Sequence, residues 1–256
     1  MSGLRPRLNF EPEWRFTFLT VVLVPLLVGL GFWQLQRAED KANLAAAFEE
    51  RQRQPPAPLA VLWDQPTQSL AYAPVHLRGS FLPDQYFLLD NQVQHGKVGY
   101  EVLGILLLSD GTGSVLVNRG WIAGDAARRL LPEVPIVEGP VAITGYVYVA
   151  PDSPYLLAEQ QLETGWPKRI QAVEMNKLAP AVVALQGGQV FPFPIRMNTG
   201  QPGALAVNWQ VVNMSPQKHR GYAVQWFAMA TLLTVFYLLY SSNLWPLMTG
   251  SGKAGK

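Results

Sequence analysis

Two long stretches without a charged residue constrain this chain more than any other feature. The first lies between Arg15 and Arg37, and the second runs from Gly221 to Gly252. Each is long enough to cross a hydrocarbon core, which takes about 20 apolar residues in a helix. The charged residues gather between them, and no third apolar run approaches this length. The sequence therefore predicts two transmembrane helices, over residues 16–36 and 221–245, that flank a soluble middle segment.

The first stretch has to be distinguished from a cleaved signal peptide, because basic residues precede it. Its apolar part exceeds the roughly 7–15 residues of a signal h-region, and no small-residue cleavage site follows at the right distance. We therefore expect a retained anchor. Two spans place both termini on one side of the membrane and residues 37–220 on the other. Basic residues flank the two spans in similar numbers, so the positive-inside rule does not choose the side.

Composition and motifs narrow the classes of function. The chain has no cysteine, which excludes disulfides, thiolate catalysis, zinc fingers and iron–sulfur clusters. A net charge of +2 without a stripe of Lys and Arg gives no case for nucleic acid. No G-x-S-x-G, H-E-x-x-H or G-x-G-x-x-G pattern occurs, and we interpret the terminal GSGKAGK as a flexible end rather than a phosphate loop. A membrane-anchored hydrolase would need a nucleophile and a base that these patterns do not offer, so we predict no enzymatic activity.

The middle segment changes character near Ala73. Before it, RAEDKANLAAAFEERQRQ is rich in helix formers and predicts a helix that continues out of the first span and ends before Pro55. After it, short runs rich in Val, Ile, Tyr and Leu predict strands: PVHLRGSF, QYFLLDNQV, VGYEVLGILLL, SVLVNRGWI, PVAITGYVYV, KRIQAVEM and ALAVNWQVVN. Asp110–Gly111 predicts a hairpin turn, and residues 175–184 predict a short helix. The predicted fold class is a membrane protein of the α+β type, whose β-rich middle domain is an antiparallel sheet or barrel-like.

The first span contains two residues that affect helix packing. Pro25 and Gly29 share a helix face with Phe32 and Gln36. We expect this face to allow a kink and the close approach of another helix.

The three histidines are too widely spread for a local metal triad. His76 lies in a predicted strand and His95 in a predicted turn, and we interpret both as ordinary surface residues. His219 stands where the polar segment gives way to the second span. On a helix it shares one face with Tyr222, Ala223, Trp226 and Ala230. This face indicates either an axial imidazole ligand for haem iron or a belt of interfacial side chains that fixes the depth of the span.

Arg119 and Trp121 form a second candidate site, at the end of the strand that contains VNRGW. A guanidinium and an indole side by side suit the carboxylate of a partner or a propionate group. The alternative is an arginine packed on its own tryptophan for stability.

Three separated segments of the sequence resemble segments of one known family: GFWQLQRAEDKANL, VGYEVLGILLLSDGTGSVLVNRGW and HRGYAVQWFAMA. Together they resemble the Surf1 (Shy1) family of cytochrome c oxidase assembly proteins, in order, spacing and two-anchor topology. The resemblance covers essentially the whole chain. It implies a protein of the bacterial or the mitochondrial inner membrane, and the lack of a longer leader rich in Ser and Arg before the first span favours the bacterial case. We therefore expect residues 37–220 in the periplasm and the tails, residues 1–15 and 246–256, in the cytoplasm.

The resemblance also implies a function in the maturation of subunit I of haem-copper oxidase, around the insertion of haem a, with haem a synthase as a further partner. Some relatives are thought to bind haem a through the histidine that opens the second span, which is the place of His219 here. We therefore expect a haem chaperone without turnover, in which His219 is the axial ligand. A slot for the ring would have Gly29, Phe32 and Trp33 on one side and Tyr222, Ala223 and Trp226 on the other.

In this hypothesis Arg119 and Trp121 dock a partner or cover the propionates. Loading should weaken as the pH falls through the titration of the histidine, because only neutral imidazole binds the iron. The alternative hypothesis is a structural scaffold that holds subunit I during its maturation and never touches the cofactor.

Overall fold

The computed structural model of the protein describes residues 8–125, 127–150, 159–209 and 214–245. They belong to two compact units. One draws on both ends of the chain, residues 1–46 and 211–256, and the other on residues 47–210. Residues 1–7 of the predicted N-terminal tail and the whole predicted C-terminal tail, 246–256, lie outside the described residues. The predicted domain boundaries at 37 and 220 stay predictions.

Two long helices make up the first unit. Helix α1 spans Trp14–Gln52 and helix α5 spans Pro216–Tyr240. Both are long and apolar enough to cross a membrane, and only 6% and 11% of their most apolar windows is buried. A core helix of a soluble protein would be mostly covered, so this bare apolar surface fits a lipid environment. The described fold therefore confirms a membrane protein of the α+β type, and α1 continues to Gln52 as its helix formers predict.

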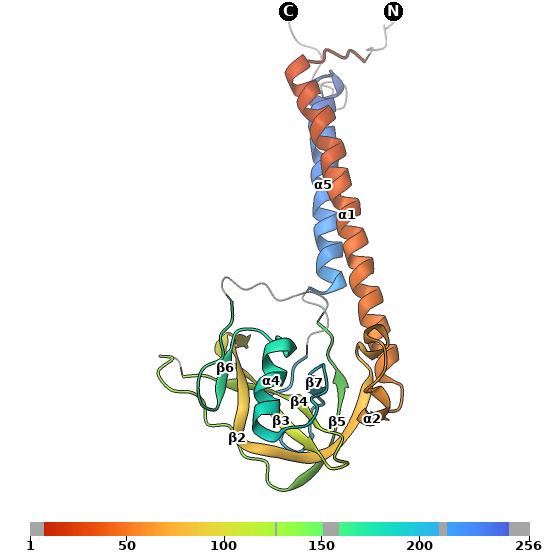
Figure 1. The fold of residues 1–256 in the computed structure, drawn as a ribbon. Coiled ribbons are helices and arrows are strands. Elements are labelled where there is room, and N and C mark those ends of the chain that lie inside the picture. The colour runs from red at the N-terminus through yellow and green to blue at the C-terminus, as the bar shows by residue number, and fades with distance from the viewer. Residues whose placement is uncertain (1–7, 126, 151–158, 210–213, 246–256) are drawn as a thin grey trace, which may run out of the picture. The chain divides into compact units, whose positions relative to one another are not determined.

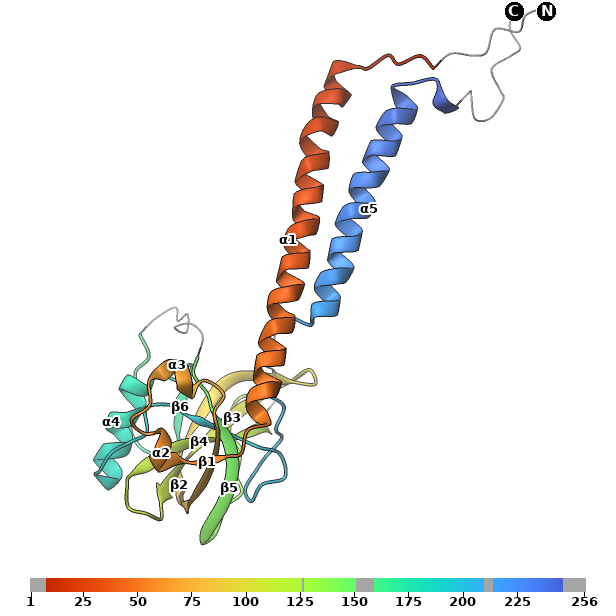
Figure 2. The same ribbon diagram turned by 90° about the vertical axis from the view of Figure 1, so that its right-hand side faces the viewer.

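Helices α1 and α5 lie side by side (Figure 2). The hydroxyls of Thr17 and Tyr237 are 2.8 Å apart, and the rings of Phe32 and Phe227 meet edge to face at 5.3 Å. At one end the segment before α1 pairs with the segment after α5, where the amide of Glu11 donates to the carbonyl of Ser241 at 2.8 Å. Direct contacts at several levels therefore hold the pair together.

The helix contact does not use the predicted glycine. A Cβ on Gly31 would lie 2.5 Å from the Phe227 ring, whereas no atom outside its own helix lies within 4 Å of a Cβ on Gly29 in the described structure. A helix turns about 100° per residue, so these two glycines point to nearly opposite sides. The predicted face of Pro25 and Gly29 is therefore wrong as the site of close approach, and Gly31 takes that role.

The second unit is built on a sheet that closes on itself (Figure 1). Its ring consists of β2 (Pro74–Gln94), β3 (Lys97–Leu108), β4 (Ser114–Ala123), β7 (Ile195–Met197) and β5 (Pro140–Val147), which returns to β2. Strands β1 (Ala57–Pro58) and β6 (Lys168–Ile170) add to β2 in parallel, and β4 and β7 are parallel too. Of the two predicted forms the barrel-like one is confirmed, but the sheet is mixed rather than purely antiparallel.

The predicted strands correspond to the observed ones with several differences. Of KRIQAVEM only Lys168–Ile170 is a strand, and the two-residue strand β1 was not predicted. PVHLRGSF and QYFLLDNQV form a single strand, β2, with a register shift between Phe81 and Tyr86, where Pro83 has no amide to donate. Strand β7 was not predicted. The expected strand ALAVNWQVVN is absent from its described part, residues 204–209, apart from one bridge between Ala206 and Trp121. Gly120, at φ +111°, interrupts the regular ladder of β4 at this point.

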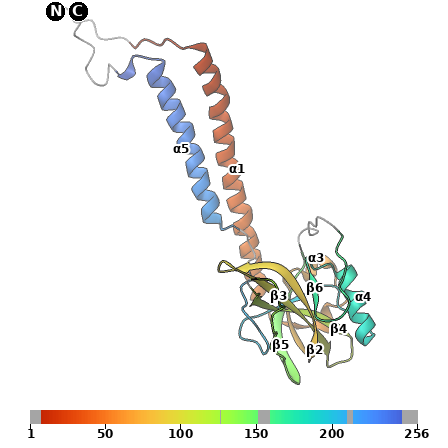
Figure 3. The same cartoon turned by 90° about the vertical axis from the view of Figure 1, so that its left-hand side faces the viewer.

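The two larger of three hydrophobic clusters among the described residues support the ring. The first contains every second residue along the strands, as expected for side chains that point inside a closed sheet. It includes Val75, Leu77, Val115, Val117, Ile143, Val147, Ile195 and Met197. The other joins Leu178 and Val182 of helix α4 (Met175–Gln186) to Phe87, Leu103, Ile105 and Leu116. Helix α4 confirms the predicted short helix and covers the sheet (Figure 3). Two single-turn helices, α2 (Leu59–Leu62) and α3 (Thr67–Leu70), lead into β2.

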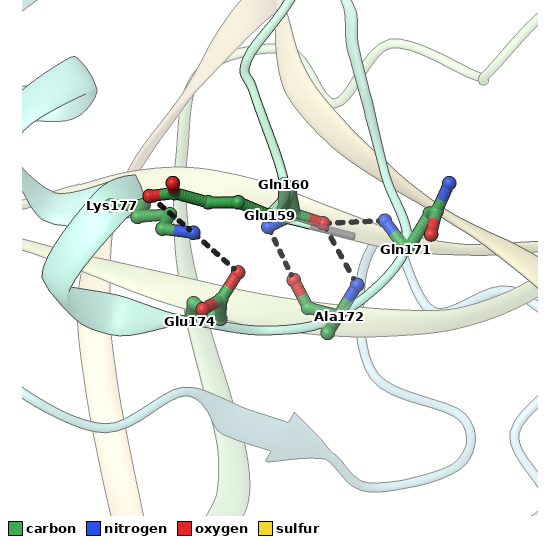
Figure 4. Close-up of polar contacts among 6 residues, drawn as sticks. All are labelled: Glu159, Gln160, Gln171, Ala172, Glu174 and Lys177. Atoms are coloured by element: carbon green, nitrogen blue, oxygen red, sulfur yellow. Dashed lines mark hydrogen bonds and ion pairs between the residues drawn. The ribbon is translucent and has the colours of Figure 1, made fainter. Parts of the chain in front are cut away.

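Local polar contacts shape the turns. The Asp110–Gly111 turn is confirmed, with Gly111 at φ +73°. The hydroxyl and amide of Thr112 donate to Asp110 and lower the pKa of that carboxyl. Before α4, the amide side chain of Gln160 bonds the backbone of Gln171 and Ala172 at 2.6–3.1 Å (Figure 4). Beside it, Lys177 forms ion pairs with Glu159 and Glu174. These contacts hold the segment before α4 and the first turn of that helix in place.

Candidate functional site

His219 lies in the first turn of α5, next to a polar side chain of α1. Ser215, in an extended conformation, and Pro216 start this helix, since proline suits the first helical position. The Nδ1 atom of His219 is 2.7 Å from Oε1 of Gln34. Because a carbonyl oxygen only accepts, Nδ1 is the donor in this contact, and in the neutral ring with this contact the lone pair lies on Nε2. That Nε2 atom is buried and has no hydrogen-bond partner among the described residues.

Gln34 was missed by sequence reasoning, which considered Gln36 instead. The available signal is that Gln34 is a polar side chain near the end of an uncharged apolar run. Polar residues in membrane helices usually face the interior of the helix bundle. A partner that orients the second ring nitrogen is typical of histidines that bind metals.

The other predicted cofactor residues differ in their burial. Ala223 is buried at 1% exposure, and Trp226 is half-buried. Trp33 and Tyr222 are 51% and 44% exposed. The structure thus brings His219 to Gln34. The roles of Trp33, Tyr222 and Trp226 in binding a cofactor stay predictions.

Arg119 is a buried arginine of β4, with only 4% of its surface exposed. Its Nε donates to the carbonyl of Gly203 and its Nη2 to the carbonyl of Pro135, both at 2.8 Å, while Cζ lies 5.4 Å from the centre of the Phe81 ring. Burial lowers the pKa of Arg119. The interpretation as an arginine packed on Trp121 is therefore wrong, because its ring partner is Phe81. Docking of a partner stays a prediction, although this guanidinium already holds two loops of its own chain.

Trp121 lines a pocket of about 230 Å³ on the second unit, and its indole donates to the carbonyl of Gln92 at 3.0 Å. A different arginine, Arg196 of β7, lines the same pocket. Its Cζ lies 3.6 Å from the ring centre of Tyr148 and 4.9 Å from that of Trp209. Sequence reasoning missed Arg196 because no local pattern in FPFPIRMN connects it to VNRGW.

The other two histidines are surface residues, as predicted. His76 is exposed, with its Nδ1 atom 3.2 Å from the carbonyl of Pro56, and His95 sits in a turn at φ +49°. Among the residues that the structure describes, no three His, Asp or Glu side chains gather as they would around a metal ion.

These features define a class: a membrane-anchored protein with a barrel-like domain between two helices, one of which carries a histidine with a free nitrogen. The profile of the SURF1 family matches residues 21–231. The chain therefore belongs to the SURF1 family, and the resemblance seen in its sequence is confirmed.

Individual relatives agree with this assignment. The chain is 26% identical over 235 residues to a SURF1-like protein of Rickettsia felis, which covers 88% of this chain and 96% of the relative. It is 28% identical over 162 residues to Surfeit locus protein 1 of Gallus gallus, covering 56% and 51% of the two chains. It is also 30% identical over 95 residues to the cytochrome oxidase assembly protein SHY1 of Saccharomyces cerevisiae, covering 37% of this chain and 24% of the relative.

Proposed function

We propose that this protein is an assembly factor for haem-copper cytochrome c oxidase, anchored in the inner membrane, that handles haem a for insertion into subunit I. Membership of the SURF1 family and the likeness to SHY1 support the assembly role. The observation that carries the haem role is the Nε2 atom of His219, which is buried and has no hydrogen-bond partner among the described residues, while Nδ1 contacts Gln34. In this proposal residues 37–220 are periplasmic, haem a synthase is a further partner, and the protein has no turnover of its own.

The chemistry of this site fits haem a as a cargo. Haem iron takes an axial bond from a neutral imidazole, and the hydrogen bond to Gln34 holds His219 in the tautomer that leaves Nε2 free. Nε2 is enclosed in the structure, so the ring or a neighbouring side chain has to move before it can reach a metal. Trp33 and Tyr222 offer exposed aromatic surface on the two helices, which suits contact with an apolar macrocycle.

The test is the haem content of protein purified from cells that make haem a, measured by its visible spectrum. We expect His219→Ala to lose the haem and His76→Ala, on the exposed strand surface, to keep it. Gln34→Leu keeps the ligand but removes its orienting partner, so haem affinity should fall roughly 10–100-fold. Equal haem in the wild type and His219→Ala would show that His219 is not the axial ligand.

One observation favours a second candidate, the structural scaffold. The His219–Gln34 hydrogen bond also serves as a polar contact between two apolar helices, which is a sufficient reason for a buried histidine. On this hypothesis the protein would be colourless and would still co-purify with oxidase subunit I. Loss of that association in Gln34→Leu, with no haem in any variant, would support the scaffold over the chaperone.

A further inference from the structure

The pocket beside Trp121 is lined by a positive charge, Arg196, and a negative one, Glu101. Arg196 forms no ion pair with any described acidic side chain, and its Nε is buried without a hydrogen-bond partner among the described residues. Burial raises the pKa of the neighbouring Tyr146 hydroxyl, and the charge of Arg196 acts against that rise. Arg119, by contrast, is bonded along its edge to two carbonyls.

The aromatic rings beside the guanidinium of Arg196 influence which ligand it can bind. Tyr148 lies 3.6 Å and Trp209 4.9 Å from the guanidinium carbon. A guanidinium stacked on aromatic rings still presents N–H groups along its edge, and an in-plane pair of these groups matches the two oxygens of a carboxylate. The aromatic rings also restrict the rotamers of Arg196, so little conformational entropy is lost on binding.

The opposite wall of the pocket supplies acceptors. Glu101 lines it, and one of its carboxylate oxygens already accepts a hydrogen bond from the side chain of Asn118 at 2.6 Å. A bare anion would meet repulsion from this acid, whereas a carboxylate that carries N–H groups nearby would complement both charges. Polypeptide segments have this combination. At about 230 Å³ the pocket is also smaller than the roughly 300–1,000 Å³ of small-molecule sites, and fits one side chain.

The rim is suited to contact with another protein. Residues 92–94 of the β2–β3 hairpin border the pocket, and Val93 and Val98 pair across the two strands with 65% and 43% of their surfaces exposed. We infer that this pocket is a docking site for an acidic side chain of a partner polypeptide, with Arg196 binding the carboxylate and Glu101 accepting from adjacent N–H groups. The inference does not depend on haem binding by His219.

The probe is N-acetyl-glutamate amide, titrated into the full-length protein in detergent and followed by saturation-transfer NMR. Its uncharged analogue N-acetyl-glutamine amide and plain acetate are the comparison ligands. Arg196→Gln removes the charge, and Asn208→Asp adds an acid at the exposed rim without touching Arg196. Arg78→Gln, an exposed arginine of β2 outside this pocket, is the matched control.

We expect saturable binding of the glutamate probe to the wild type and Arg78→Gln with a roughly millimolar dissociation constant, as for a single charged contact. Affinity should fall at least about tenfold in Arg196→Gln and several-fold in Asn208→Asp. Equal affinity for the glutamine analogue, or unchanged affinity in Asn208→Asp, would overturn the site even if Arg196→Gln failed to fold. Acetate bound as tightly as the glutamate probe would overturn the assignment to a polypeptide.

Discussion

Arg119 provides the sharpest test of how the second unit is held together, through the substitution Arg119→Met. Methionine keeps the unbranched apolar stem over Phe81 but removes both hydrogen bonds, to Gly203 and Pro135. A carbonyl left without a partner costs about 1–3 kcal/mol when it is buried. Pro135 is exposed and Gly203 is half-buried, so water can replace part of the loss at Pro135.

Removing a buried charge offsets some of this cost, because burial already disfavours the charged form of Arg119. The net expectation is a destabilisation of about 2–4 kcal/mol. For a unit of this size each kcal/mol lowers the melting temperature by about 2–4 °C, so a decrease of at least about 4 °C is expected.

The assay is thermal unfolding of the full-length protein in detergent, followed by near-UV circular dichroism of its tryptophans. Arg78→Met, on the exposed surface of β2, is the control and should stay within about 0.5 kcal/mol of the wild type. Arg119→Lys should lie in between, since an ammonium cannot span both carbonyls as a planar fork does. A melting temperature for Arg119→Met equal to that of Arg78→Met would refute the structural role of Arg119.

Three further predictions have definite expected outcomes. Burial raises the pKa of Tyr146 to about 12, although the neighbouring Arg196 acts in the opposite direction. Stability should therefore be constant below about pH 10 and fall toward pH 12, and Tyr146→Phe should abolish this alkaline loss in denaturant titrations without lowering stability at pH 7. Gly79→Ala would place a Cβ against the carbonyl oxygen of Leu107, so we expect the free energy of unfolding to fall by more than about 3 kcal/mol. An unfolding midpoint of Gly79→Ala equal to that of the wild type would contradict this close packing. Gly31→Leu should widen the distance between spin labels on α1 and α5, because Phe227 occupies that space, whereas Gly29→Leu should not.

The fold was largely predictable where local chemistry decides it. The charge-free runs, the Asp110–Gly111 turn and most of the β-rich segments depend on properties of consecutive residues, and these predictions were confirmed; the exception is ALAVNWQVVN, whose described part forms no strand. Strand β7 has no such signal, because Ile195–Met197 follows two prolines and is too short to show alternation. It is a strand only because β4 and β5 lie on either side of it.

The candidate sites were less predictable because they depend on residues far apart in the chain. The face that begins at His219 was recognised, but its partner Gln34 depends on which side of α1 meets α5. The expected guanidinium beside an indole exists, yet Arg196 rather than Arg119 lines the pocket with Trp121. Alternation along β4 explains this, because Val115 and Val117 belong to the inner cluster and Arg119 follows in the same phase.

Strand β7 also sets the timing of folding during synthesis. It contributes three residues to the ring, and until they are made the neighbouring edges of β4 and β5 have no partner there. Unpaired edges readily recruit strands from other chains. Because β7 ends at Met197 and α5 begins at Pro216, the ring can close only shortly before the second anchor emerges. A chain cut between the end of β5 at Val147 and Ile195 would therefore leave the ribosome with the edges of β4 and β5 unpaired at this place and open to strands of other chains.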